Sequence, residues 1–331
     1  MKNITILATG GTIAGAGEPG QNLGYKSGAI AAAELVAAVP ELENVANVSV
    51  EQVCNVNSDD ITDKIWLQLS RRINELEQDS NVDGIVVMHG TDTMEETAYF
   101  LSLTIDGSKS SSRRGAKPVV LTGSMRPATA AEPDGPGNLL GAVRAAVGFA
   151  VDDDAPENFV WVYFAGELFD ARHVQKCSAC ALNSMGVDGP GEGSNWNAPR
   201  EKNFFDVSNM EELPRVNVVY FAVDANPRIL EFATSVSEGL VIAGAGAGEF
   251  SKEWAETLER IDIPVVVATR INHGSVALDT SLARGPDGVA RVSAGDIPPA
   301  KAAVLLRLAL TQTTNPKKLN NFFNCPLTPG T

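Results

Sequence analysis

The chain is poor in the residues from which metal sites and disulfide frameworks are built. It has 4 cysteines and 3 histidines among 331 residues. Cys177 and Cys180 form a lone C-x-x-C, without a second pair or a histidine at zinc-ligand spacing. The histidines, at positions 89, 173 and 273, are scattered and are interpreted as structural. We therefore expect no metal site, and chemistry that depends on neither a metal nor a cysteine.

Positive charge and long hydrophobic runs are also scarce. The 26 Lys and Arg face 41 Asp and Glu, and the formal net charge is -15. Such a chain repels a phosphate backbone, which argues against a nucleic-acid partner. The basic cluster from Lys109 to Lys117 is interpreted as a solvated surface loop. Because no run of about eighteen apolar residues occurs and no signal-peptide core follows Met1, we expect a soluble chain without a membrane partner.

What the chain does have is a series of short apolar runs separated by helical patterns. They are typical of strands buried on both faces and cover residues 4–8, 85–88, 119–121, 159–165, 216–223, 240–243 and 265–268. Thr93 to Glu96 has the form of a capping box that opens a helix, and another helix is expected from Ala300 to Leu310. This alternation predicts an α/β fold with a mainly parallel sheet and a ligand crevice beyond the carboxyl ends of its strands.

The length of 331 residues predicts two domains. A stretch rich in Gly, Pro, Asn and charge is interpreted as the connection between them. We expect a larger N-terminal doubly wound domain with a mainly parallel sheet at residues 1–190. A linker is expected at 191–214, and a smaller C-terminal α/β domain at 215–331.

The first candidate site residues follow the first predicted strand. Gly10-Gly11-Thr12 presents a hydroxyl among backbone N–H groups, which suits a nucleophile or an anion cradle, and equally a plain tight turn. A loop then leads to Tyr25, whose phenol is placed to close over a ligand. Further along, the carboxylate of Asp59, beside Ser58, suits an ammonium group, although helix capping explains this cluster equally well.

A second candidate turn, Gly90-Thr91-Asp92, follows another predicted buried strand. A threonine hydroxyl is a poor nucleophile until a base accepts its proton, and a desolvated lysine beside a carboxylate can serve as that base. Lys176 is the candidate lysine, with a solvated surface residue as the alternative. The glycines from Gly244 to Gly248 have the spacing G-x-G-x-G, which is wrong for a dinucleotide fingerprint, so no nicotinamide or flavin cofactor is expected.

Together these motifs resemble the bacterial type II L-asparaginases and the related glutaminase-asparaginases, from Asn3 to Phe323. The matching phrases are Ile4-Thr5-Ile6-Leu7-Ala8-Thr9-Gly10-Gly11-Thr12-Ile13-Ala14-Gly15, His89-Gly90-Thr91-Asp92-Thr93-Met94-Glu95-Glu96-Thr97-Ala98, Met125-Arg126-Pro127, Asp134-Gly135-Pro136 with Asn138-Leu139, and Leu308-Ala309-Leu310-Thr311-Gln312-Thr313. The first two phrases are highly specific in combination.

The resemblance implies a double displacement in which Thr12 attacks the side-chain amide, ammonia leaves and water hydrolyses the acyl-enzyme. The implied catalytic residues are Thr12, Tyr25, Thr91, Asp92 and Lys176. The implied substrate-binding residues are Ser58, Asp59, Gly11 and Gly90. The implied substrate is L-asparagine, with L-glutamine as a side substrate and no cofactor. Also implied are a homotetramer of paired dimers, with subunit contacts from the C-terminal domain, and a periplasmic or secreted location, with the cytoplasm as the alternative.

Three departures from the family pattern bear on substrate binding. Asp59 stands where the family commonly has Gln or Glu, and Ala247 stands where a neighbouring subunit usually supplies Asn or Ser. The usual acidic residue after the R-x-x-x-G turn falls on Ser281, with Asp279 nearby. Alternative interpretations are therefore a glutaminase-preferring amidohydrolase, the amidase subunit of a tRNA-dependent amidotransferase, and a non-catalytic amino-acid-binding protein. The relative ammonia release from asparagine and glutamine tests the glutaminase alternative. Copurification with tRNA would indicate the amidotransferase subunit, and binding without ammonia release would indicate the binding protein.

Overall fold

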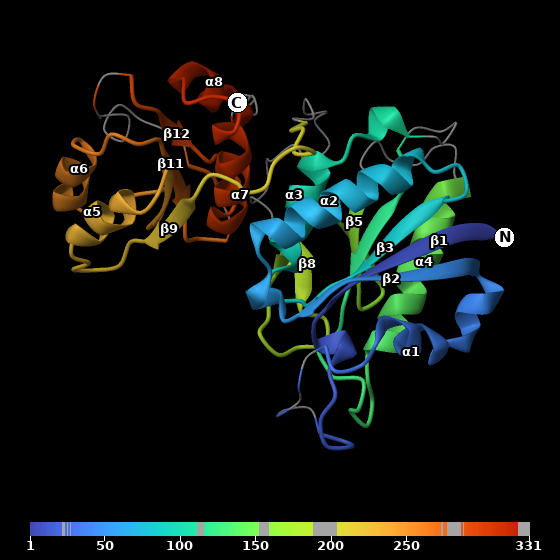
Figure 1. Ribbon diagram of the computed structural model, residues 1–331. Coiled ribbons are helices and arrows are strands. Elements are labelled where there is room, and N and C mark those ends of the chain that lie inside the picture. The colour runs from blue at the N-terminus through green and yellow to red at the C-terminus, as the bar shows by residue number, and fades with distance from the viewer. Residues whose placement is uncertain are drawn as a thin grey trace, which may run out of the picture. The chain divides into compact units, whose positions relative to one another are not determined.

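The chain forms two compact units in a computed structural model. The structure describes residues 1–21, 24, 26, 28–110, 116–151, 159–187, 204–272, 274–276, 286 and 288–323. The first unit comprises Met1–Val187 with Asp206–Glu211, and the second includes Phe205 and the described residues from Glu212 onward (Figure 1). The expected linker at 191–214 lies partly outside the described residues, and its segment Asp206–Glu211 packs with the first unit. The proposed domain boundaries stay predictions.

A six-stranded sheet in the order β2-β1-β3-β4-β5-β6 forms the centre of the first unit. Its strands are β1 (Lys2–Gly10), β2 (Ala46–Val56), β3 (Gly84–Met88), β4 (Val119–Thr122), β5 (Val160–Phe164) and β6 (Glu167–Asp170). All neighbouring pairs are parallel except β5 with β6. The expected mainly parallel sheet is therefore confirmed. Strands β3 and β4 are buried along their whole length, as their apolar runs predict.

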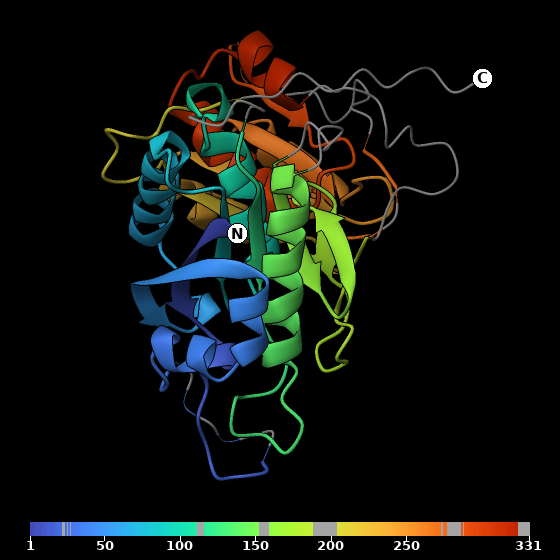
Figure 2. The ribbon, with the colours of Figure 1, turned by 90° about the vertical axis from the view of Figure 1, so that its right-hand side faces the viewer.

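Helices cover both faces of this sheet (Figures 1 and 2). α1 (Ala32–Ala37) and α4 (Gly135–Val151) cover one face, and α4 buries Leu139, Ala142 and Val143 against Ile4, Ile6 and other residues of that face. α2 (Asp63–Gln78) and α3 (Met94–Thr104) lie on the other face, where Trp66 stacks on Phe100 with ring centroids 5.0 Å apart. The shorter 3-10 helices are η1 (Thr12–Ala14), η2 (Pro40–Asn44), η3 (Ser58–Asp60) and η4 (Gly107–Lys109).

A small hairpin carries Lys176. Strands β7 (Val174–Lys176) and β8 (Met185–Val187) pair antiparallel in a two-stranded sheet of their own. Before this hairpin the chain forms strand β6, Glu167–Asp170, at the edge of the six-stranded sheet. Phe169 is buried and the other residues of β6 are not. Only one of its four side chains is therefore buried, although Leu168 is also apolar.

The second unit has its own parallel sheet in the order β12-β11-β10-β9. The strands are β9 (Val216–Tyr220), β10 (Gly239–Gly244), β11 (Val265–Thr269) and β12 (Arg291–Ser293). The helices are α5 (Arg228–Ser235), α6 (Lys252–Leu258), α7 (Pro299–Leu310) and α8 (Pro316–Phe323). α7 has proline in its first turn, as expected from the sequence. Within the described ranges, no helix is long and apolar enough to cross a membrane.

Lys117 corrects the expectation of a solvated basic loop. Residues 111–115 lie outside the described part of the chain, but Lys117 is buried. Its Nζ donates to the carbonyl oxygens of Leu76 and Asp79 at 2.7 and 2.6 Å, at the end of α2. Its backbone N–H donates to the buried carboxylate of Glu77 at 3.0 Å. The lysine therefore adds a charged donor to two carbonyls at the end of the helix, each of which also accepts a backbone N–H.

Candidate active site

The predicted site residues gather where four neighbouring parallel strands end. Gly11 and Thr12 follow β1, Ser58 follows β2 and Thr91 follows β3. Met125 follows β4, which is the next strand of the order β2-β1-β3-β4. Because the carboxyl ends of parallel strands meet at one edge, segments distant in sequence converge there. This edge is the crevice that the sequence pattern predicts.

Two glycines bring the Thr12 turn and the Thr91 loop into backbone contact. Gly11 has φ +82°, and a Cβ on it would lie 2.5 Å from both Cα and N of Gly90. A Cβ on Gly90 would lie 2.8 Å from Oγ of Ser58. These close approaches require residues without side chains at both positions. The contact therefore places Thr12, Ser58 and Thr91 in one site.

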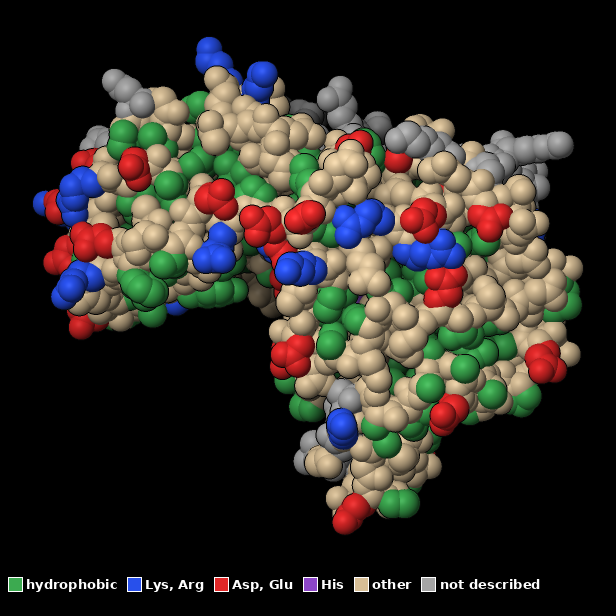
Figure 3. Space-filling view, in the orientation of Figure 1, with side chains coloured by type: hydrophobic (Ala, Val, Ile, Leu, Met, Phe, Trp, Pro, Cys, Tyr) green, Lys and Arg blue, Asp and Glu red, His purple; other side chains and the backbone are tan. Residues whose placement is uncertain are grey.

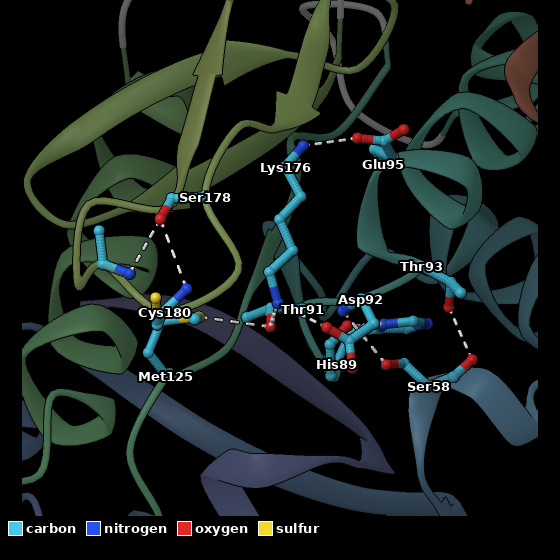
Figure 4. A network of polar contacts seen from close by, with 12 residues as sticks. Ser58, His89, Thr91, Asp92, Thr93, Glu95, Met125, Lys176, Ser178 and Cys180 are labelled. Carbon is cyan, nitrogen blue, oxygen red and sulfur yellow. Dashed lines mark hydrogen bonds and ion pairs between the residues drawn. The ribbon is translucent and has the colours of Figure 1, made fainter. Parts of the chain in front are cut away.

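Lys176 contacts both members of the Thr91-Asp92 pair (Figure 4). Its Nζ donates to Oγ1 of Thr91 at 2.8 Å and forms an ion pair with the Asp92 carboxylate. The Lys176 side chain is 15% exposed, so the Asp92 carboxylate, 67% exposed, offsets a largely desolvated ammonium. The Thr91 hydroxyl also donates weakly to Sδ of Met125 at 3.5 Å. If Lys176 were a neutral amine, its nitrogen would be close enough to accept the proton of the Thr91 hydroxyl.

Ser58 is held by the loop that carries Thr91. Its Oγ accepts the backbone N–H of Asp92 at 3.3 Å, and its carbonyl accepts the Thr93 hydroxyl at 2.7 Å. Both contacts differ from the sequence interpretation. Thr93 occupies the N-cap position of α3 without a side-chain cap hydrogen bond, so the expected capping box is wrong. Helix capping by the cluster around Ser58 and Asp59 is also wrong, because the N-cap of α2 is Thr62 and no side-chain cap hydrogen bond is present there. Asp59, next to Ser58, is exposed.

Glu95 is the site contact that the sequence interpretation missed. Its Oε2 accepts the backbone N–H of Lys176 at 2.6 Å. An acidic residue in the first turn of a helix is ordinarily explained by the helix dipole, so its sequence position alone gave no signal for this role.

His89 belongs to a buried chain of hydrogen bonds beneath the loop. The indole N–H of Trp66 donates to Oγ1 of Thr97 at 2.8 Å, and that hydroxyl contacts Nε2 of His89 at 3.0 Å. Nδ1 of His89 contacts the carbonyl of Gly90 at 2.7 Å, which makes Nδ1 the protonated nitrogen. Burial lowers the pKa of His89 to about 4. The imidazole is therefore neutral and structural, as the sequence interpretation holds.

The loop after β4 is shaped by two residues of the Asp134-Asn138 phrase. The Asp134 carboxylate accepts the backbone N–H groups of Met125 and Arg126, both at 2.9 Å. Asn138 donates to the carbonyl of Gly123 at 2.9 Å and accepts the backbone N–H of Ala165 at 3.0 Å. These contacts fix Met125 beside Thr91.

The structure leaves part of the predicted site undescribed. Thr12 begins η1 and is half-buried, while Tyr25 lies outside the described residues. Ala247 is exposed in the loop after β10, and Asp279 and Ser281 again lie outside the described residues. Among the residues that are described, no group of three or more His, Cys, Asp or Glu is arranged to hold a metal ion.

In α/β enzymes, ligands bind beyond the carboxyl ends of the parallel strands, and the polar groups of this chain gather at that edge. Residues 3–192 match the family described as Asparaginase, N-terminal. Residues 215–323 match the Glutaminase/Asparaginase C-terminal domain. The chain therefore belongs to the asparaginase family, as the motifs indicate.

Relatives match over nearly the full length. The chain is 38% identical to the "Probable L-asparaginase periplasmic" of Haemophilus influenzae, over 98% of this chain and 93% of the relative. It is 33% identical to the "Glutaminase-asparaginase" of Pseudomonas fluorescens, over 98% and 90% respectively. A crystal structure of the "Probable Cytoplasmic L-asparaginase" from Campylobacter jejuni is similar with a TM-score of 0.85 and 36% identity, covering 98% of this chain and 99% of that one.

Proposed function

We propose that this chain is an L-asparaginase that hydrolyses L-asparagine to L-aspartate and ammonia through a threonine acyl-enzyme, with L-glutaminase as a side activity. The observation that carries the proposal is the contact of Lys176 with Thr91 and Asp92, beside a second threonine turn. A non-catalytic receptor needs no such pair of threonines with a lysine at one of them. The reaction needs neither a metal nor an organic cofactor.

Thr12 is the proposed nucleophile. Its turn consists of glycines, so a planar amide can approach the hydroxyl closely. The Thr12 oxygen adds to the amide carbon, the C–N bond breaks, and the nitrogen leaves as ammonia after taking up the threonine proton. Tyr25 assists this step. In the second half-reaction, Lys176 as the neutral amine removes a proton, through the Thr91 hydroxyl, from the water that attacks the ester carbon, and Asp92 offsets the charge that the lysine gains. The bond between the acyl carbon and the Thr12 oxygen then breaks, and the proton passes to that oxygen, which releases aspartate and restores the threonine.

Substrate binding is assigned to groups around the two turns. Ser58 and Asp59 bind the α-carboxylate and α-amino groups, and the backbones at Gly11 and Gly90 border the side-chain amide. The Thr91 backbone N–H is a suitable donor to the oxyanion of the tetrahedral intermediate. Because the Pseudomonas relative is named "Glutaminase-asparaginase", a preference for glutamine is the alternative proposal. Rates of ammonia release from asparagine and from glutamine distinguish the two preferences.

The test of the mechanism separates the two threonines. Thr12→Ala is expected to abolish acyl-enzyme formation. Thr91→Val is expected to permit slow acylation and to accumulate the intermediate. Mass spectrometry of Thr91→Val after brief exposure to asparagine should find the adduct on the peptide that contains Thr12. Thr12→Ala treated in the same way is the control, and an adduct on any other peptide would overturn the assignment.

The proposed assembly is a homotetramer. Large apolar side chains are exposed on and near β9 and α5 of the second unit, among them Tyr220, Val223 and Phe232 at 59%, 91% and 66% (Figure 3). An exposed apolar surface of this kind supports contact with another subunit. The proposed compartment is the periplasm or the exterior, by analogy with the Haemophilus relative. Because the Campylobacter protein is named as cytoplasmic, the cytoplasm is the alternative proposal.

A further inference from the structure

The strand that carries Lys176 lies outside the main sheet. Among the described strands, β7 pairs with β8 alone, and a two-stranded hairpin is marginally stable by itself. Just beyond the paired residues, the backbone N–H of Cys177 donates to the carbonyl of Ser184, the residue before β8, at 2.7 Å. Hydrogen-bonded and non-hydrogen-bonded pairs alternate in an antiparallel ladder, so the backbone N–H of Lys176 points away from β8. The position of Lys176 therefore depends on a tie to another element.

Glu95 supplies that tie. Its carboxylate accepts the outward N–H of Lys176 at 2.6 Å, in the place where a neighbouring strand would supply a carbonyl. Glu95 lies in the first turn of α3, and Thr91 and Asp92 stand just before that helix. One short segment thus binds the backbone of Lys176 through Glu95 and the tip of its side chain through Thr91 and Asp92 (Figure 4).

We propose that Glu95 is a positioning residue for Lys176. A lysine side chain is long and flexible, so the placement of its ammonium depends on where its main chain is anchored. A hydrogen bond to an ionised carboxylate is shorter and stronger than a neutral one, which makes it an effective anchor. Glu95 thereby holds the lysine at the distance from which Nζ reaches the Thr91 hydroxyl. The inference rests on the proposed role of Lys176 in the threonine chemistry.

Four variants of the full-length protein test the inference: Glu95→Ala, Glu95→Gln, Lys176→Met and the control Glu253→Ala. Like Glu95, Glu253 is an acidic residue in the first turn of a helix, here α6, but it is exposed; its loss reproduces the helix-dipole effect in the other unit. Glu95→Ala is expected to lower kcat for asparagine on the order of tenfold to a hundredfold, with KM little changed. Glu95→Gln keeps an acceptor oxygen and is expected to recover most of the rate. Glu253→Ala is expected to retain kcat.

Circular dichroism at the assay temperature and Tm for each variant separate positioning from unfolding. Glu95→Ala with a kcat close to that of Glu253→Ala would overturn the inference, and so would Glu95→Gln as slow as Glu95→Ala. A fall in kcat matched by a loss of folded protein, or a change confined to KM, would also contradict it. Lys176→Met is expected to be nearly inactive. An active Lys176→Met would refute the proposed function of the lysine itself, which is a different result from a failure at Glu95 alone.

Discussion

Replacing Gly11 with alanine tests whether the backbone contact between the two turns is needed for activity. The new Cβ would lie 2.5 Å from both Cα and N of Gly90, whereas carbon atoms in contact stand about 3.5–4.0 Å apart. The Thr12 turn and the Thr91 loop would therefore separate by roughly 1 Å. A misplacement of that size can cost about a hundredfold in rate. Gly11 has φ +82° and ψ −173°, a region essentially confined to glycine, so an alanine there adds backbone strain of about 1–3 kcal/mol.

Gly288→Ala is the control for Gly11→Ala. Gly288 lies in the second unit and has φ +81°, almost the same as the +82° of Gly11, but no heavy atom lies within 4 Å of its would-be Cβ. Both variants therefore place a Cβ at a positive φ, and of the two only Gly11→Ala introduces the clash. Ammonia release should show kcat near that of the wild type for Gly288→Ala and about a hundredfold lower for Gly11→Ala. Similar kcat values for the two variants, with both folded, would refute the reasoning.

Two further predictions concern stability and assembly. Burial raises the pKa of Glu77 above its usual value of 4.5, so its contribution to stability is present below that value and is lost as pH rises through the raised pKa. The Tm of Glu77→Gln relative to wild type should therefore increase from pH 4 to pH 8; a pH-independent difference would contradict the raised pKa. Activity should vanish on dilution to the protomer, because the family resemblance implies that a neighbouring subunit completes the site with the loop at Ala247; sedimentation of a fully active monomer would exclude this assembly.

The parallel core of the fold could be predicted because its strands are buried on both faces. Residues 85–88 and 119–121 carry continuous apolar runs, and the structure has β3 and β4 there. Strand β2 was missed. It lies at the sheet edge, is mostly half-buried or exposed, and includes Asn47, Ser49 and Glu51 on or near its surface. A strand with one neighbour and polar side chains has no continuous apolar run to mark it.

The sequence predicted those site residues whose type has a single structural explanation at their position. It did not predict the contacts of residues whose type has several explanations. Gly11 and Gly90 lie where the backbone approach requires glycine. The position of Thr93 indicated capping and that of Glu95 an ordinary helix-dipole role, whereas in the structure they contact Ser58 and Lys176. Lys117 shows the same ambiguity. A lysine in a basic stretch is usually solvated, and only the tertiary fold brings it to the end of α2.

The hydrogen-bond chain through His89 also fixes the orientation of a peptide group. A carbonyl oxygen can only accept, so Nδ1 of His89 carries the proton toward Gly90; Nε2 then accepts the Thr97 hydroxyl, which itself accepts the indole N–H of Trp66. The described peptide bonds are trans, so turning the Gly90 carbonyl toward the imidazole turns the Thr91 N–H to the opposite side. With the pKa of His89 at about 4, this dipole keeps its direction at neutral pH. The donor is therefore preorganised by the packing of α2 and α3, before any substrate binds.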